Sequence, residues 1–254
     1  MVALSLTIAG ALGIVLTGGY LWWEMGRYTT PQVTENRFDE RRMIFAYTLG
    51  LFVGILLSLP WLLYLTAMAN AAVLGALALL ALLVLAIELA EWAIRRTHYW
   101  GNGPSFPFYA VGLRAGIAGI LVLALAGQYL SASSITWDGV SVVGLQAVAI
   151  VALEVTGALL SLPATPSGTP RRGIGLLSGA LISGIGLFLL GFSAFGGEVV
   201  GAVAAGIVLI GAIYLYRQAR AILDRVPPPS LVGVPAPVAA AGRYGRKDRD
   251  PPAP

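Results

Sequence analysis

The sequence predicts an all-α integral membrane protein: a bundle of seven transmembrane helices with the N-terminus outside the cell and the C-terminus in the cytoplasm. Three observations lead to this prediction. Only 11% of the 254 residues are charged and 57% are hydrophobic, whereas a soluble domain carries about 25% charged residues. The apolar residues form runs long enough to cross a bilayer, which takes roughly 20 helical residues. The arginines are concentrated in alternate connections between these runs.

The apolar runs are rich in Leu, Ala and Gly and lack the period-two alternation of membrane strands, so each is predicted to be a helix. The predicted spans are residues 2–23, 43–68, 71–94, 107–130, 140–162, 174–195 and 199–216. No basic segment precedes the first run, so we expect it to stay in the protein rather than to be removed as a signal peptide. The last run is short and is expected to continue as helix at the membrane surface.

Each run also carries its own boundary or packing signals. The first ends at a Trp–Trp pair, which is typical of the membrane–water interface. The second contains Pro60, which is expected to kink it. Glycines four residues apart predict close helix packing in the second, fourth and sixth runs. These pairs are Gly50 and Gly54, Gly112 and Gly116, and Gly175 and Gly179.

The basic residues predict the orientation of the bundle. The connections after the first, third and fifth runs contain arginines, and so does the C-terminal tail, whereas the connections after the second, fourth and sixth runs contain no basic residue. Basic connections stay in the cytoplasm, so the N-terminus is predicted to lie outside. An error in the number of spans would disrupt this alternation, so the pattern also supports seven.

Two regions differ in composition. Residues 1–225 are predicted to form the transmembrane domain, and residues 226–254 a disordered, Pro- and Ala-rich basic cytoplasmic tail. The tail is interpreted as a topology anchor near anionic lipid, with docking of a cytoplasmic partner as the alternative. We expect a multi-pass protein of a prokaryotic plasma membrane. Its expected partners are the lipid bilayer and a membrane protein or a second copy bound through the Gly-rich faces, without nucleic acid.

Four ionisable residues lie inside or at the rim of the apolar runs: Glu88, Glu91, Arg114 and Glu154. A charge near the bilayer centre costs on the order of 3 kcal/mol or more unless it is paired or hydrated. Arg114 and Glu154 are equally far from the middle of the turn joining their runs, and so are Glu88 and Arg114. The three are therefore predicted to lie at one depth, roughly 12 Å from the cytoplasmic connections at 1.5 Å per helical residue.

We expect Arg114 to hold Glu154 on one side and Glu88 on the other, since a guanidinium has five donors. Two carboxylates for one cation leave a surplus charge, which a proton, a cation or a hydrated cavity must offset. Glu88, Arg114, Glu154 and Gln146 are therefore candidates for a substrate or ion path in a small carrier or channel. The alternative is an interhelical staple in a non-catalytic subunit, scaffold or sensor. Glu91 is expected to pair with Arg95 at the rim, without a function.

The residue inventory also excludes several classes of function. Cysteine is absent and His98 is the only histidine, so we predict no haem, metal site or other cofactor. Seven spans with an external N-terminus resemble the microbial rhodopsins, whose retinal binds a lysine in the last span. The only lysine here is Lys247 in the tail, which excludes retinal. No catalytic constellation is recognisable, so an enzyme is the least favoured class.

Overall fold

The structure is a computed structural model that describes residues 2–30, 32–33, 36–70, 72–97, 105–132, 136–161, 170–193 and 197–226. Within these ranges it is helical and contains no strand. The elements are α1 (Val2–Met25), η1 (Gly26–Tyr28), α2 (Glu40–Ala69), α3 (Val73–Arg96), α4 (Phe106–Ala132), α5 (Trp137–Leu160), α6 (Pro170–Ser193), α7 (Glu198–Ala219) and α8 (Ala221–Asp224). The predicted tail, residues 226–254, lies outside the described residues except for Val226.

Five stretches are long and apolar enough to cross a membrane: Glu40–Ala69, Val73–Arg96, Phe106–Tyr129, Trp137–Leu160 and Glu198–Asp224. The chain is therefore a multi-pass helical membrane protein. Helices α1 and α6 each have 24 residues and lie alongside the others. The count of seven spans and the external N-terminus remain predictions.

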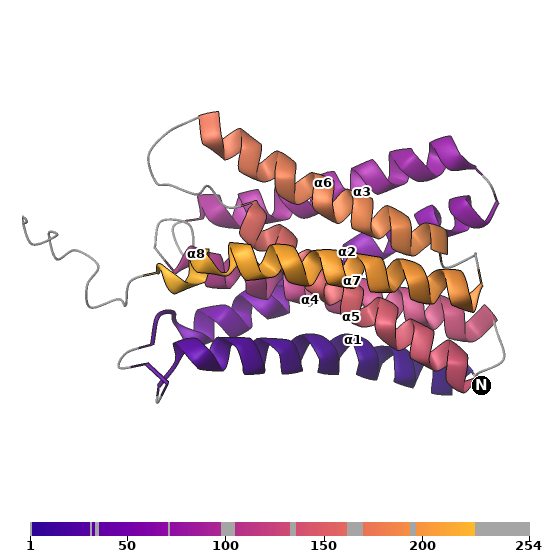
Figure 1. Ribbon diagram of the computed structural model, residues 1–254, viewed down its shortest axis with the longest axis horizontal. Coiled ribbons are helices and arrows are strands. Elements are labelled where there is room, and N and C mark those ends of the chain that lie inside the picture. Colours follow the sequence, from indigo (N-terminus) through magenta and orange to yellow (C-terminus); the bar gives the residue numbers. More distant parts are fainter. Residues whose placement is uncertain are drawn as a thin grey trace, which may run out of the picture.

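Successive long helices run in opposite directions, so α1, α3, α5 and α7 all end on the same side of the bundle (Figure 1). We call this side the basic end, because apart from Arg114 every arginine of the described residues lies there. The opposite end, where the N-terminus lies, carries Asp138 and Glu198 in the first turns of α5 and α7. The difference in positive charge between the two ends follows from the alternation of connections with and without arginine in the sequence.

Helix α4 forms the centre of the bundle, with 83% of its membrane-spanning window buried and with α1, α2 and α5 packed around it. Glycines bring α2 and α4 close together: a Cβ on Gly50 would overlap the carbonyl oxygen of Leu113, and one on Gly116 would overlap that of Tyr47. The close packing predicted for the glycine pairs of the second and fourth runs is confirmed. In the sixth run Gly179 packs closely against α5, and the surroundings of Gly175 lie outside the described part of the chain. Such packing uses van der Waals contact, which drives helix association in a bilayer where the hydrophobic effect does not.

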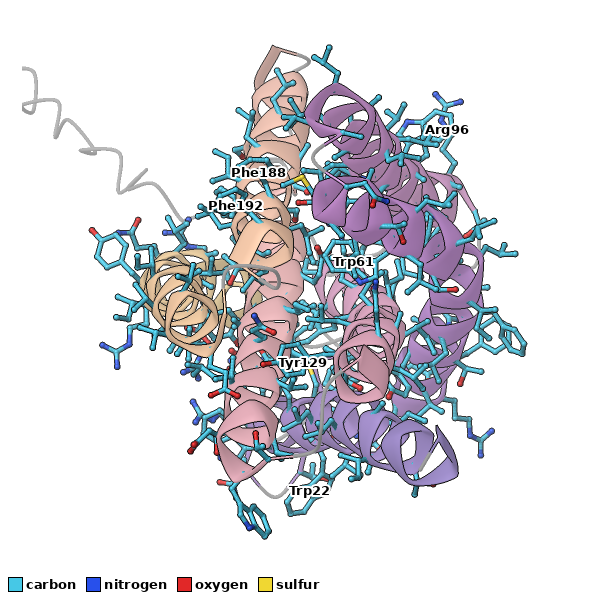
Figure 2. All side chains as sticks on the ribbon, turned by 90° about the vertical axis from the view of Figure 1, so that its right-hand side faces the viewer. Trp22, Trp61, Arg96, Tyr129, Phe188 and Phe192 are labelled. Atoms are coloured by element: carbon cyan, nitrogen blue, oxygen red, sulfur yellow. The ribbon has the colours of Figure 1, made fainter. Side chains whose placement is uncertain are left out.

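The outer helices pack around this core and expose apolar side chains. Helix α3 lies against α2 and α6, and α7 lies against α5. The Tyr64 hydroxyl of α2 donates to the Phe188 carbonyl of α6 at 3.2 Å, and the Thr156 hydroxyl of α5 donates to the Ala212 carbonyl of α7 at 3.2 Å. Viewed from the end, apolar side chains project all around the bundle, with Trp22 at its edge (Figure 2). Such a surface suits lipid rather than water.

Candidate functional site

The guanidinium of Arg114 lies at the centre of a buried ionic cluster. Its Nε donates to Glu91 Oε2 at 2.9 Å, its Nη1 donates to Glu154 Oε2 at 3.0 Å, and its Nη2 donates to Glu88 Oε1. Arg114 and Glu154 are fully buried, and Glu88 and Glu91 are at most 8% exposed. We call these four residues the Arg114 cluster.

Two serine hydroxyls complete the surroundings of the guanidinium. Nη2 lies 3.3 Å from Ser161 Oγ, and Nη1 lies 3.5 Å from Ser183 Oγ. Ser161 Oγ is also 3.2 Å from Glu88 Oε2, so it bridges the arginine and that carboxylate. The guanidinium therefore has a polar neighbour for every N–H direction, which is how a buried arginine avoids the cost of unpaired donors.

Three helices supply the Arg114 cluster, a fourth supplies Ser183 beside it, and glycines make the space for these side chains. Glu88 and Glu91 come from α3, Arg114 from α4, Glu154 from α5, and Ser183 from α6. A Cβ on Gly157 would lie 2.6 Å from Ser183 Oγ and 3.5 Å from Arg114 Nη1. A Cβ on Gly179 would overlap Ser161 Oγ. The small residues of α5 and α6 thus let polar groups meet between backbones.

The predicted ion pair between Arg114 and Glu154 is confirmed, and Glu88 contacts the same guanidinium. The prediction for Glu91 is wrong. Its carboxylate was expected at the rim beside Arg95, but it is 3% exposed and contacts Arg114. A residue at i+3 shares a helix face with residue i, so the spacing of Glu88 and Glu91 was the signal that both face the bundle.

The cluster contains more negative than positive groups. Three carboxylates surround one guanidinium, so with all groups ionised the cluster would carry two surplus negative charges. Taking a carboxylate out of water costs several kcal/mol, and a partner offsets that cost only when the geometry is good. A single arginine cannot neutralise three acids, so the buried state requires protons or another cation to balance the rest.

Unpaired polar atoms lie along α5. Glu154 Oε1 is buried and has no hydrogen-bond partner among the described residues. Gln146, two turns towards the opposite end, is fully buried, and neither its side-chain oxygen nor its nitrogen has such a partner there. Gln146 therefore does not bond a neighbouring helix in the described structure. Buried polar atoms are normally paired, so these three atoms are exceptions among the described residues.

A second ionic group, which the sequence did not reveal, lies at the basic end. Glu24 is almost fully buried at the end of α1, with Arg220 Nε at 3.2 Å and Arg27 Nε at 3.7 Å. The Tyr28 hydroxyl donates to Asp224 Oδ1 at 2.9 Å, and burial raises the pKa of Tyr28. These contacts join the end of α1 and the first connection to the residue that follows α7 and to α8. Glu24 directly follows the run predicted at residues 2–23, so the sequence places it in the connection and gives no sign of its burial.

Comparison with known protein families, with curated proteins and with solved structures finds no match to this chain.

Proposed function

We propose that this protein is a small proton- or ion-coupled carrier or channel of the cell membrane, and that the Arg114 cluster is its coupling site. The observation that supports this proposal is the excess of carboxylates around one buried guanidinium. A structural staple needs only one carboxylate per arginine. The additional acids are costly in lipid, and intramembrane acids with partial pairing are typical of proton relays and ion pathways.

A proton suits this site better than a metal cation. Among the described residues, no three acidic or histidine side chains are arranged to hold a metal ion. The guanidinium already occupies the space between the three carboxylates. Glu154 keeps one oxygen, Oε1, outside these ion pairs and without a hydrogen bond. That oxygen is the one we assign to proton uptake and release.

The test is a flux measurement with a dye. The purified protein is reconstituted into liposomes that contain a pH-sensitive dye, and a potassium diffusion potential is applied. We expect the wild-type protein to acidify or alkalinise the lumen and Glu154→Gln to abolish this response, since an amide cannot release a proton. Glu198→Gln is the matched control because Glu198 is an exposed glutamate at the start of α7. Equal flux in wild type and Glu154→Gln would refute the role of Glu154.

A second candidate function is a non-catalytic subunit, scaffold or sensor of a larger membrane complex. The close packing favours it, since Arg114 and Glu154 are sealed from solvent on all sides. In that case the cluster joins helices, and the extra protons remain bound. Liposomes would then show no proton flux with the wild-type protein or with Glu154→Gln. A partner or a second copy would contact the exposed apolar sides of the bundle.

A further inference from the structure

The hydroxyl group of Ser161 has two acceptors within reach but only one hydrogen to donate. Its Oγ lies 2.8 Å from the Gly157 carbonyl oxygen and 3.2 Å from Glu88 Oε2, and Arg114 Nη2 donates to it at 3.3 Å. A serine hydroxyl has one hydrogen and two acceptor lone pairs. The arginine occupies one lone pair, so the hydrogen goes either to Gly157 or to Glu88.

When Glu88 is ionised, the hydrogen of Ser161 goes to its carboxylate, because a hydrogen bond to a carboxylate is stronger than one to a neutral carbonyl. The Gly157 carbonyl is not left unpaired, since the backbone N–H of Ser161 donates to it at 2.9 Å. Glu88 then accepts from Arg114 Nη2 at Oε1 and from Ser161 at Oε2. Both oxygens of the carboxylate are therefore paired.

When Glu88 is protonated on Oε2, the direction of the same bond reverses. The carboxyl O–H donates to the second lone pair of Ser161 Oγ, and the serine hydrogen goes to the Gly157 carbonyl at 2.8 Å. Gain or loss of a proton at Glu88 therefore leaves none of these buried donors and acceptors unpaired. Glu154 differs, because its Oε1 has no hydrogen-bond partner among the described residues.

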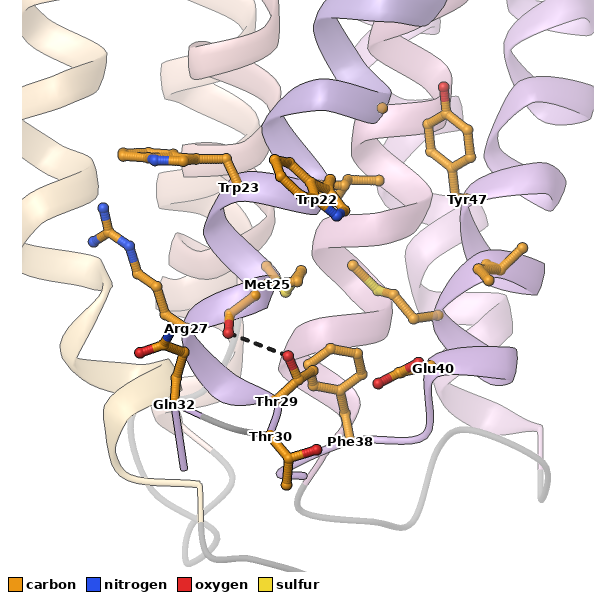
Figure 3. Close-up of a pocket in the computed structure, with 15 residues that line it drawn as sticks. Trp22, Trp23, Met25, Arg27, Thr29, Thr30, Gln32, Phe38, Glu40 and Tyr47 are labelled. Carbon is orange, nitrogen blue, oxygen red and sulfur yellow. Dashed lines mark hydrogen bonds between the residues drawn. The ribbon is translucent and has the colours of Figure 1, made fainter. Parts of the chain in front are cut away.

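Glu88 is also the most exposed acid of the Arg114 cluster. Its side chain is 10% exposed, compared with 4% for Glu91 and 0% for Glu154. A groove of about 720 Å³ opens at the basic end between the end of α1 and the start of α2, but no residue of the cluster lines it (Figure 3). A proton needs no such cavity. It needs only an acceptor and a partner for the O–H bond that forms, and Glu88 and Ser161 supply both.

We propose that Glu88 is a second proton-binding site of the Arg114 cluster and that Ser161 is the positioning residue that pairs with it in both of its states. Binding adds one proton to Glu88 Oε2 and removes one negative charge from the cluster. With a second proton on Glu154, the two surplus negative charges are balanced. The charged groups that face Glu88 are Arg114, Glu154 and Glu91. This role rests on the proposed function only in that protons, rather than a metal ion, balance the cluster, and it does not require transport.

The test is infrared spectroscopy of the full chain reconstituted in lipid, recorded as the difference between spectra at acid and alkaline pH. Protonated carboxyl groups absorb in a carbonyl band that ionised carboxylates lack. We expect Glu88→Gln to remove one component of this band, because an amide takes up no proton. The substitution keeps an oxygen for Arg114 and an N–H for Ser161, so the variant should fold. An identical band in wild type and Glu88→Gln would overturn Glu88 as a proton site.

The same spectra test the role of Ser161. Ser161→Ala should shift the Glu88 component of the band, since the carboxyl O–H loses its acceptor, and Thr156→Val should leave it in place. Thr156 is the matched control because its buried hydroxyl on α5 donates to the carbonyls of Ala152 and Ala212. An unshifted component in Ser161→Ala would overturn the role of the serine. Loss of the component in Glu88→Gln without proton flux in wild-type liposomes would refute the proposed function and support the Glu88 site.

Discussion

Removing Arg114 would test the energetics of the buried cluster most directly. Arg114→Leu leaves Glu88, Glu91 and Glu154 without their shared cation, inside the bundle. The guanidinium makes five polar contacts, three with carboxylates and two with serines. At about 0.6 kcal/mol for each interhelical contact in a membrane, these amount to about 3 kcal/mol. Stranding a buried charge by removing its partner costs about 3–5 kcal/mol, which agrees.

Removal of the acids should restore stability in steps. Arg114→Leu with Glu154→Leu is expected to recover only part of the loss, about 1 kcal/mol, because two buried carboxylates remain and each contact is modest. Changing all four cluster residues to leucine should recover most of it, since well-packed apolar residues often replace a buried ionic group without cost. Gly157 and the serines stay unchanged, so the variants differ only in charge and packing at the cluster.

The assay is unfolding by SDS in mixed micelles, followed by intrinsic tryptophan fluorescence. Arg217→Leu is the control, because Arg217 is an exposed arginine in the last turn of α7. It should leave the unfolding midpoint close to that of wild type. If Arg114→Leu unfolds at the wild-type midpoint, or if the variant with four leucines is no more stable than Arg114→Leu, the cluster does not hold the helices together and the reasoning fails.

Three further predictions concern packing, topology and cofactors. Gly157→Ala should lower stability by about 1–3 kcal/mol in the same assay, because its Cβ would lie 2.6 Å from Ser183 Oγ; Gly144→Ala on the same helix meets no atom within 4 Å and should not be destabilising by this mechanism. Because the chain has no cysteine, Gln32→Cys and Ser133→Cys each provide a single site for a membrane-impermeant maleimide. We expect the maleimide to label Ser133→Cys from outside the cell and Gln32→Cys from the cytoplasm only. Cytoplasmic labelling at position 133 would refute the seven-span arrangement. The purified protein should be colourless and free of stoichiometric haem or transition metal, as checked by absorption and elemental measurement, and a visible band that persists through purification would contradict this.

Much of the fold is predictable because a bilayer limits which backbone structures can cross it. Every backbone polar group must be satisfied internally, so long apolar runs become helices. The run predicted at residues 71–94 is observed as α3 at Val73–Arg96, and the run at residues 140–162 as α5 at Trp137–Leu160. The ends differ by a few residues because caps decide them. Asp39, for example, accepts from the backbone N–H of Arg41 at 2.9 Å and starts α2.

The candidate site was partly predictable, because short connections keep consecutive helices in register. Equal distances from the turns were enough to bring Glu154 and Glu88 to Arg114. The same counting does not give the rotation of a helix about its axis. Glu91 was therefore assigned to Arg95, a local partner four residues away, although its carboxylate contacts Arg114. Ser161 and Ser183 were missed because hydroxyl groups are common in apolar helices and carry no depth signal.

The sequence by itself determined the class of protein, the helical runs, the asymmetry of charge between the two ends and the common level of Glu88, Arg114 and Glu154 in the bundle. These properties depend on composition and on distance along the chain, because in a bilayer long apolar runs become helices of fixed rise per residue. Only the tertiary structure decided which faces meet. It added Glu91 to the cluster and paired Glu24 at the end of α1 with Arg220 at the end of α7. Such contacts depend on the rotation of each helix about its axis and on the close approach of helices at glycines such as Gly50 and Gly157. Both depend on the packing of many residues at once.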